Sequence, residues 1–309
     1  LSRKWFLDGK RRILKAPPAN LRILRAEALA FLGEKVPAAS LAGLHVGVVG
    51  AGSSAMDSAA TALENGAASV DLLVRRSDLP RINKSKGSGT PGLTHGQFLL
   101  PDAWKWRIRH YINVQQVPPP HGSTLRVSRH ANAHFNLGCA VQKVEQDGDR
   151  LRVDTPRGVF VLDFLIVSTG FAIDWRQRPE FADLAPHVRI WSDRFVPEAG
   201  AEDQELSDSP DLGPLFEFQE KTPGALPGLD HVHCFCYPAA LSHGTVSGDI
   251  PAISDGARKL AQGLASLFYR EDLEHHYAQL QSYSEPELDG SEWTPADPEA
   301  RVRALADKT

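Results

Sequence analysis

The most restrictive feature of the sequence is a short apolar run that leads directly into a glycine-rich turn and then into an alanine-rich stretch. After His45, residues 46–49 are apolar and rich in valine, and Gly50, Gly52 and Ala55 follow in the order Gly-x-Gly-x-x-Ala. The alanine-rich stretch predicts a helix that ends near residues 65–66, where an Asn-Gly pair suits a helix C-terminus. A strand, a tight turn and a helix in this order begin a βαβ unit, which predicts a parallel sheet.

The small residues of the turn each have a physical role. Gly50 permits the tight bend, Gly52 lets the backbone approach a pyrophosphate, and Ala55 allows the helix to pack closely. The backbone amides at the start of the helix, around Ser53 and Ser54, would face the phosphates. We therefore expect a dinucleotide at this turn, with a purely structural turn as the alternative.

The end of the second strand indicates which dinucleotide is bound. Residues 70–74 complete the βαβ unit, and Arg75 and Arg76 follow where a site for NAD places an acidic residue. A guanidinium there suits a 2′-phosphate, and Lys84 and Lys86 add positive charge nearby. NADP(H) is therefore expected over NAD(H). The alternative is that both arginines mark an ordinary solvated strand end.

Hydrophobic periodicity and turn residues predict the remaining elements. Helices are expected at residues 21–33, 101–111 and 254–269. Strands are expected at 141–145, 151–154, 159–162, 164–167 and 231–237, of which the first three form a meander. Two irregular stretches are expected, a Gly- and Pro-rich excursion at 77–123 and an acidic, solvated loop at 198–211.

Two segments outside the βαβ unit add candidate site residues. The strand at 164–167 runs into Ser168, Thr169 and Gly170. Farther along, Gly248 and Asp249 precede the helix expected at 254–269. Asp249 suits a helix N-cap, so a plainly capped helix is the alternative to a binding role.

From about residue 41 to residue 264 the chain resembles the superfamily of flavin-dependent monooxygenases and pyridine-nucleotide oxidoreductases. The phrase VGVVGAGSSAMD, residues 46–57, is similar to the NADPH turn of class B flavin monooxygenases. Thr169 and Gly170, which follow a meander, are similar to an Ala-Thr-Gly-like turn of these flavoproteins. In the family, a Gly-Asp pair such as Gly248–Asp249 hydrogen-bonds the flavin ribityl chain. The resemblance thus implies two cofactors, NADP and FAD.

The chain also departs from the family pattern. No second Gly-x-Gly-x-x-Gly follows a strand, and Pro37 stands where a Phe-x-Gly-x-x-x-His segment would place histidine. The expected fold is α/β, a Rossmann-like parallel sheet with a β-meander of the type that carries two dinucleotide-binding domains, its FAD domain incomplete at the N-terminus. The expected divisions are an N-terminal segment at 1–43, an NADP-binding domain at 44–168, the C-terminal part of an FAD-binding domain at 169–283, and a polar tail at 284–309.

The composition of the chain limits which kinds of partner it is expected to bind. The formal charge of −4 over 309 residues is too balanced for a broad nucleic-acid footprint. No apolar run is long enough to span a membrane, and three cysteines cannot build a disulfide framework. We therefore expect a cytoplasmic protein with a small-molecule substrate and neither nucleic acid nor membrane as partner. The oligomeric state is left open.

Other chemistry-bearing residues favour simpler interpretations. On a strand, His231 and His233 would point to one face and Cys234 and Cys236 to the other, so no metal site is expected. The one-residue spacer of the two cysteines also argues against a redox pair. The aromatic and histidine side chains of the helix at 101–111 are expected to pack a core more than to line a pocket; they are Trp104, Trp106, His110 and Tyr111.

The leading hypothesis is an NADPH-dependent flavoprotein oxidoreductase, monooxygenase-like, in which NADPH delivers hydride to FAD and the reduced flavin reacts with O₂. No catalytic side chain is assigned, because the protein's part is positioning and exclusion of water. The alternatives are an NADPH-dependent flavin reductase or dehydrogenase with another acceptor, and a non-catalytic NADP-sensing module.

Overall fold

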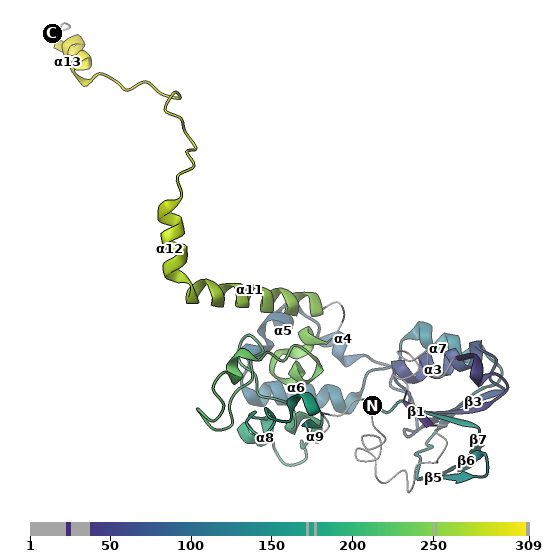
Figure 1. Cartoon of the computed structure of the whole chain (residues 1–309). Coiled ribbons are helices and arrows are strands. Elements are labelled where there is room, and N and C mark those ends of the chain that lie inside the picture. Colours follow the sequence, from purple (N-terminus) through teal and green to yellow (C-terminus); the bar gives the residue numbers. More distant parts are fainter. Residues whose placement is uncertain are drawn as a thin grey trace. The chain divides into compact units, whose positions relative to one another are not determined.

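The computed structural model describes residues 23–25, 38–170, 173–175, 178–248, 250 and 252–306. The chain divides into two compact units, Leu1–Ala257 and Arg258–Thr309 (Figure 1). The first unit contains both sheets and, by number, all of the candidate site residues. Helix α11 (Ile253–Glu271) begins in the first unit and ends in the second. Each unit is described by itself below.

A parallel sheet of five strands is the centre of the first unit. In spatial order its strands are β1 (Ile23–Arg25), β8 (Phe164–Val167), β2 (His45–Val49), β3 (Ser69–Val74) and β4 (Ala133–Leu137). Every neighbouring pair is parallel, and Val48 of β2 lies opposite Leu72 of β3 and Ile166 of β8. Both faces of such a sheet must be covered, which explains the nearly unbroken apolar runs of β2 and β8. The α/β class is confirmed.

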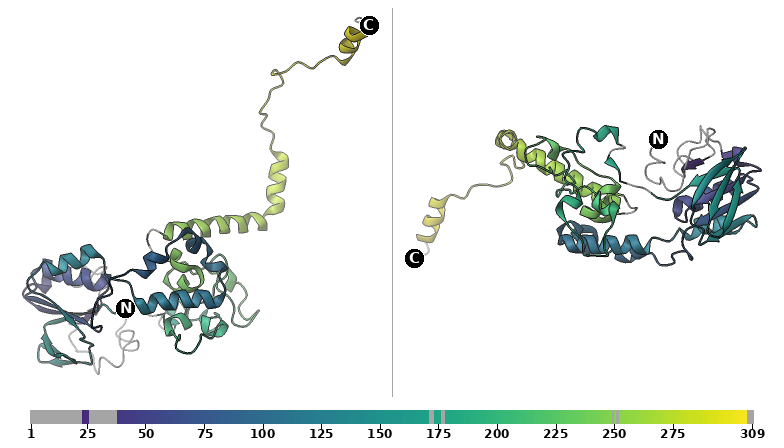
Figure 2. Two further views of the ribbon diagram at one scale, coloured as in Figure 1. Left: turned by 180° about the vertical axis from the view of Figure 1, so that it is seen from behind. Right: turned by 90° about the horizontal axis from the view of Figure 1, so that it is seen from below.

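Helices α3 (Ser53–Glu64) and α7 (His121–Ser128) cover one face of this sheet (Figure 2). Buried alanines of α3 and Val127 of α7 share a core with the side chains of β2 and β3 that point to this face. Alanine lets the helix approach the strands closely while its small side chain still excludes water. At the surface, Arg126 joins the two helices through an ion pair with Glu64, with Nη2 and Oε2 2.6 Å apart.

The opposite face of the sheet is covered by an antiparallel meander. Its strands are β5 (Lys143–Asp147), β6 (Arg150–Thr155) and β7 (Gly158–Leu162), in that order. Leu162 and Val153 pack with Leu73 and Leu165 of the parallel sheet. Gly47 permits this contact, because a Cβ added there would lie 2.3 Å from Leu162 Cδ1. The meander predicted from the sequence is confirmed.

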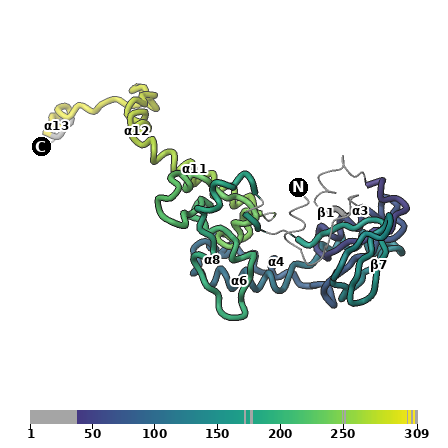
Figure 3. Tube along the Cα trace, turned by 60° about the horizontal axis from the view of Figure 1, so that its bottom comes forward, coloured from purple at the N-terminus to yellow at the C-terminus, as the bar shows by residue number. Residues whose placement is uncertain are grey.

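The excursion between β3 and β4 folds mainly as helices, and it packs against residues that come much later in the chain. Its helices are α4 (Lys84–Ser88), α5 (Pro91–Gly96) and α6 (Asp102–Gln115). The later helices are α8 (Trp191–Arg194), α9 (Gln204–Ser207) and α10 (Ala240–His243). Trp106 is buried against Trp191, Leu206 and Leu241, and its indole Nε1 donates to Ala201 O at 2.8 Å. Figure 3 shows α6 and α8 beside each other.

Several expectations for local structure are wrong. Residues Ile23–Arg25 form a strand against β8, not part of a helix at 21–33, and the rest of that range lies outside the described residues. Residues 231–237 do not form a strand: Leu229–His231 is a 3₁₀ helix and His233 makes only an isolated bridge to Glu217. Strand β4 and helix α7 were not expected from the sequence.

The second unit consists of the greater part of α11, then α12 (Leu273–Ser282) and α13 (Pro298–Ala306). The helix expected at 254–269 is thus confirmed. Among the residues that the structure describes, no helix combines the length and the apolar character needed to cross a lipid bilayer.

Candidate functional site

The carboxyl ends of β2, β8 and β3 form one edge of the parallel sheet, and most of the predicted site residues lie there. The glycine turn follows β2, Ser168-Thr169-Gly170 follows β8, and Arg75 follows β3. Parallel register fixes this grouping, since Val49 lies opposite both Leu73 and Val167. In open α/β sheets, ligands bind outside the carboxyl ends of the strands.

Gly50 is required by the local geometry. Its φ is +129°, and a Cβ at this position would lie 2.2 Å from the backbone oxygen of Ser168. The two turns at the ends of β2 and β8 are therefore in direct contact through backbone atoms. They are further joined to the sheet where Gly50 N donates to Leu73 O at 3.2 Å and Ser168 N donates to Val49 O at 2.8 Å.

Gly52 is the N-cap residue of α3, and its surroundings differ from those of Gly50. A Cβ at Gly52 would meet no atom within 4 Å, so the space above this backbone is open. No side chain caps the helix, and Ser53 and Ser54 are exposed at its first turn. The unpaired amides and the positive end of the helix dipole make this N-terminus suitable for a phosphate group.

The turn after β8 has an exposed and a buried part. Thr169 and Gly170 are exposed, and Gly170 has φ +87°. Ser168 is 8% exposed, and among the described residues its buried Oγ has no hydrogen-bond partner. An unpaired buried hydroxyl beside the glycine turn fits a site whose ligand supplies the missing polar partner.

The two arginines after β3 differ in their contacts. Arg75 is exposed and, among the residues described, has neither a hydrogen bond nor an ion pair. Arg76 instead donates from Nη2 to the backbone oxygen of Val114 at 3.0 Å. Arg75 is thus the side chain available for a ligand, whereas Arg76 attaches β3 to the end of α6. Asp249, the remaining predicted site residue, lies outside the described residues.

A polar cleft of about 470 Å³ adjoins the turn after β8, and sequence reasoning missed most of its lining. Thr169 and Gly170 line it together with residues of α6, the 202–205 segment and Tyr237; those residues are His110, Asn113, Val114, Gln116, Glu202, Asp203 and Glu205. Tyr237 donates its hydroxyl hydrogen to Glu205. Burial, together with the Glu205 carboxylate, raises the pKa of Tyr237 above its ordinary value. The tyrosine therefore remains a hydrogen-bond donor at neutral pH.

The aromatic residues of α6 have separate roles. Trp106 is 2% exposed and belongs to the core, while Trp104 is 52% exposed. Of the four side chains considered from the sequence, His110 is the one that lines the cleft. In the described part of the chain, no cluster of histidine, cysteine and carboxylate side chains has the arrangement of a metal site.

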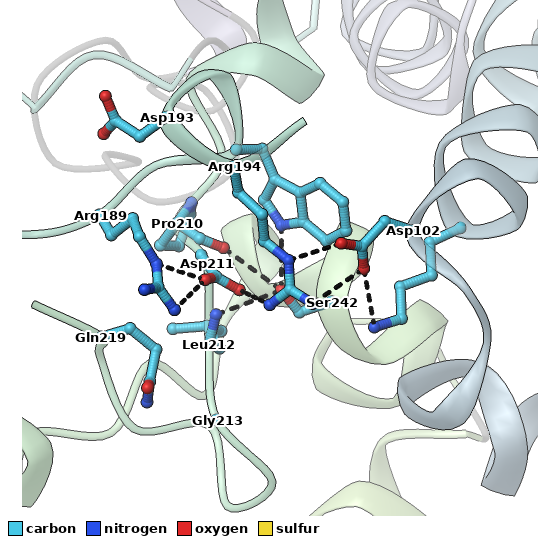
Figure 4. A network of polar contacts seen from close by, with 12 residues as sticks. Asp102, Arg189, Asp193, Arg194, Pro210, Asp211, Leu212, Gly213, Gln219 and Ser242 are labelled. Atoms are coloured by element: carbon cyan, nitrogen blue, oxygen red, sulfur yellow. Dashed lines mark hydrogen bonds and ion pairs between the residues drawn. The ribbon is translucent and has the colours of Figure 1, made fainter. Parts of the chain in front are cut away.

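A network of ion pairs around the buried Asp211 connects α8 with the start of α6 (Figure 4). Asp211, 1% exposed at its side chain, accepts from Arg189 at 2.7 Å and from Arg194 at 2.8 Å. Arg194 also binds Asp102 at the start of α6, and burial lowers the pKa of Lys105, which lies 3.7 Å from the same carboxylate. The expectation of a merely solvated acidic loop at 198–211 is therefore wrong at Asp211, because two arginines distant in sequence bury its carboxylate.

One curated protein matches the chain in sequence over most of its length. No protein-family model matches the chain. The chain is 32% identical over 276 residues to an FAD-dependent urate hydroxylase of Xanthomonas campestris pv. campestris, a match that covers 89% of this chain. The chain spans 58% of the length of that curated relative.

Solved structures share the fold at low sequence identity. They include an ornithine hydroxylase of Pseudomonas aeruginosa (TM-score 0.53, 14% identity, 81% of this chain and 58% of that one). An ornithine N-hydroxylase of Kutzneria, solved with reduced FAD, NADP⁺ and L-ornithine, has TM-score 0.53 and 14% identity over 81% of this chain and 59% of that one. An FAD-bound cadaverine monooxygenase of Erwinia amylovora has TM-score 0.53 and 10% identity over 91% and 61%.

The parallel sheet, its glycine turn and the covering meander define a dinucleotide-binding flavoprotein fold. In sequence the chain is similar to an FAD-dependent hydroxylase, and in fold it is similar to flavin-dependent monooxygenases.

Proposed function

We propose that this chain forms the NADPH-binding part, and a portion of the FAD-binding part, of an NADPH-dependent flavin monooxygenase that acts on a small molecule. The proposal rests on the groups that lie together at the carboxyl ends of β2 and β3. Three features lie at the edge of the sheet where a dinucleotide binds in this fold. They are the uncapped N-terminus of α3, the open space above Gly52, and the exposed Arg75.

The residues fit the two charged portions of NADPH, its pyrophosphate and its 2′-phosphate. Ser53, Ser54 and the buried Ala55 begin α3 and offer backbone amides to the pyrophosphate, while Gly52 leaves room for its approach. Arg75 offers two parallel N–H donors to the 2′-phosphate, which a carboxylate at that position would repel. Arg76 adds positive charge from its place against Val114.

The FAD side of the proposal depends on the turn after β8. Thr169 and Gly170 present exposed backbone at the cleft, and Asp249 remains a predicted contact to the flavin ribityl chain. When bound, NADPH supplies a hydride and FAD supplies the acceptor from which electrons pass to O₂. The part of this chain is to orient the nicotinamide coenzyme, through Gly52 and Arg75, and to shield the cleft from bulk water. The FAD-dependent hydroxylase match supports this assignment.

Anaerobic spectroscopy of the protein, expressed from its complete reading frame, tests the proposal. We expect a bound flavin whose visible absorbance is lost on addition of NADPH and returns on admission of air, with consumption of O₂. A protein purified and reconstituted without any flavin would contradict the proposal and indicate an NADP-sensing module. A flavin reduced by NADPH but inert to O₂ would instead indicate a reductase with another acceptor.

A further inference from the structure

Two cysteines lie side by side just before Tyr237, a residue that lines the cleft. The Sγ atoms of Cys234 and Cys236 are 3.6 Å apart. Cys236 has φ −156° and ψ −176°, and an extended backbone directs the side chains of residues i and i+2 to the same side. The one-residue spacer argued against a redox pair, but the observed distance between the thiols removes that objection.

The backbone around both cysteines is held in place by hydrogen bonds. Cys234 N donates to Phe216 O at 2.7 Å, and Cys236 O accepts from Ala239 N at 3.0 Å and from Ser247 Oγ at 2.9 Å. The ring of Phe235, between the two cysteines, packs edge-on against Phe216 with centroids 5.1 Å apart. The thiols are therefore positioned for reaction with each other before any oxidant arrives.

The environments of the two thiols differ in a way that assigns them separate roles. Cys234 is 7% exposed, whereas Cys236 is exposed. The hydrogen bond from Cys234 and the guanidinium of Arg178 lower the pKa of Cys236 to about 7. The same hydrogen bond and burial raise the pKa of Cys234. Cys236 is thus the accessible nucleophile and Cys234 the thiol that resolves its oxidised form.

We propose that Cys234 and Cys236 are a redox-active dithiol that a hydroperoxide converts into an intrachain disulfide. The Cys236 thiolate attacks the terminal oxygen of the peroxide, which breaks the O–O bond, forms a sulfenic acid and releases hydroxide. Cys234 then attacks the sulfenic sulfur, forms the S–S bond and expels a second hydroxide, while its own proton goes to water. Overall, two thiols and one hydrogen peroxide give one disulfide and two waters.

The cysteine pair lies next to the cleft. Cys236 directly precedes Tyr237, whose side chain lines the cleft and binds Glu205. Closing the disulfide therefore constrains the backbone one residue from the cleft wall. The inference stands apart from the proposed flavin chemistry, since any added hydroperoxide can act as oxidant.

Peptide mass spectrometry after treatment with one equivalent of hydrogen peroxide tests the inference. We expect the peptide that contains Cys234 and Cys236 to lose two hydrogen atoms in mass, and dithiothreitol to restore them. Two of the three thiols should disappear together in a thiol titration. Cys139→Ala, which removes the separate buried cysteine, should give the same result.

Single variants of the pair separate the two roles. In Cys234→Ser, Cys236 should remain as a sulfenic acid that dimedone traps. In Cys236→Ser, the peroxide-dependent loss of the Cys234 thiol should fall at least about tenfold, because Cys234 is buried. Three observations would each overturn the inference: independent loss of the two thiols, disulfides formed only between chains, or oxidation of Cys236 to a sulfinic acid while Cys234 stays reduced.

Discussion

Replacing Asp211 by alanine is expected to lower the free energy of unfolding by about 3 kcal/mol, the lower end of the range for breaking a buried ion pair. The carboxylate is 1% exposed and receives hydrogen bonds from Arg189 and Arg194, so its removal leaves two cations near the interior without their counter-charge. The lower end applies because each arginine side chain keeps more than a third of its surface in contact with solvent. Urea denaturation followed by far-UV circular dichroism measures the change.

Glu64→Gln is the matched control for this prediction. Glu64 also accepts from two arginines, Arg126 and Arg129, but its side chain is 31% exposed. We expect a loss below about 1 kcal/mol for this surface cluster, and a smaller loss at high salt. Equal effects of the two substitutions would show that burial of Asp211 does not determine the strength of its ion pairs.

Gly50→Ala is expected to lower the free energy of unfolding by about 2–6 kcal/mol. The positive φ costs an alanine about 1–3 kcal/mol, and forcing its Cβ away from the Ser168 carbonyl adds about 1–3 kcal/mol. The added methyl group would also separate the turns after β2 and β8. Denaturation midpoints of the purified variant, with NADPH absent, measure the effect.

Gly52→Ala is the counterpart that tests binding without disturbing the fold. Gly52 has φ −86° and open space above it, so the only expected cost is that of an alanine in place of an N-cap glycine, about 1 kcal/mol or less of the free energy of unfolding. The new methyl group would occupy the approach of the pyrophosphate, so NADPH affinity should fall at least about tenfold. Unchanged affinity in Gly52→Ala would place the pyrophosphate away from this turn.

The sequence predicted those parts of the fold that depend on local pattern. The βαβ unit follows from a valine-rich run, a glycine turn and an alanine-rich helix that adjoin one another. Strand β4 escaped prediction because the helical excursion separates it from β3, its partner in the sheet. Ile23–Arg25 was mistaken for helix because three residues carry too little periodicity to distinguish a strand.

Those residues of the candidate site that follow strands could be predicted, whereas contacts made by tertiary packing could not. Gly50, Thr169 and Arg75 could be grouped because parallel strands end at one edge of a sheet. The burial of Asp211 could not be predicted, because its ion pair with Arg189 forms only through tertiary packing. The same holds for the ion pair between Arg194, its second partner, and Asp102. The strand expected at 231–237 placed Cys234 and Cys236 on one face, but the distance of 3.6 Å between their Sγ atoms depends on side-chain positions that a sequence pattern does not specify.

We expect Arg75 to select the 2′-phosphate of the coenzyme, and isothermal titration of the wild type and of Arg75→Ala with NADPH and with NADH measures this selection. A lost charged hydrogen bond corresponds to about 1.5–3 kcal/mol, so the NADPH dissociation constant should rise about 10- to 100-fold while that of NADH stays nearly constant. Arg76→Ala should have the smaller effect, because Arg76 is held by Val114. Equal weakening of the binding of both coenzymes by Arg75→Ala, or tighter binding of NADH than of NADPH by the wild type, would contradict this role of Arg75.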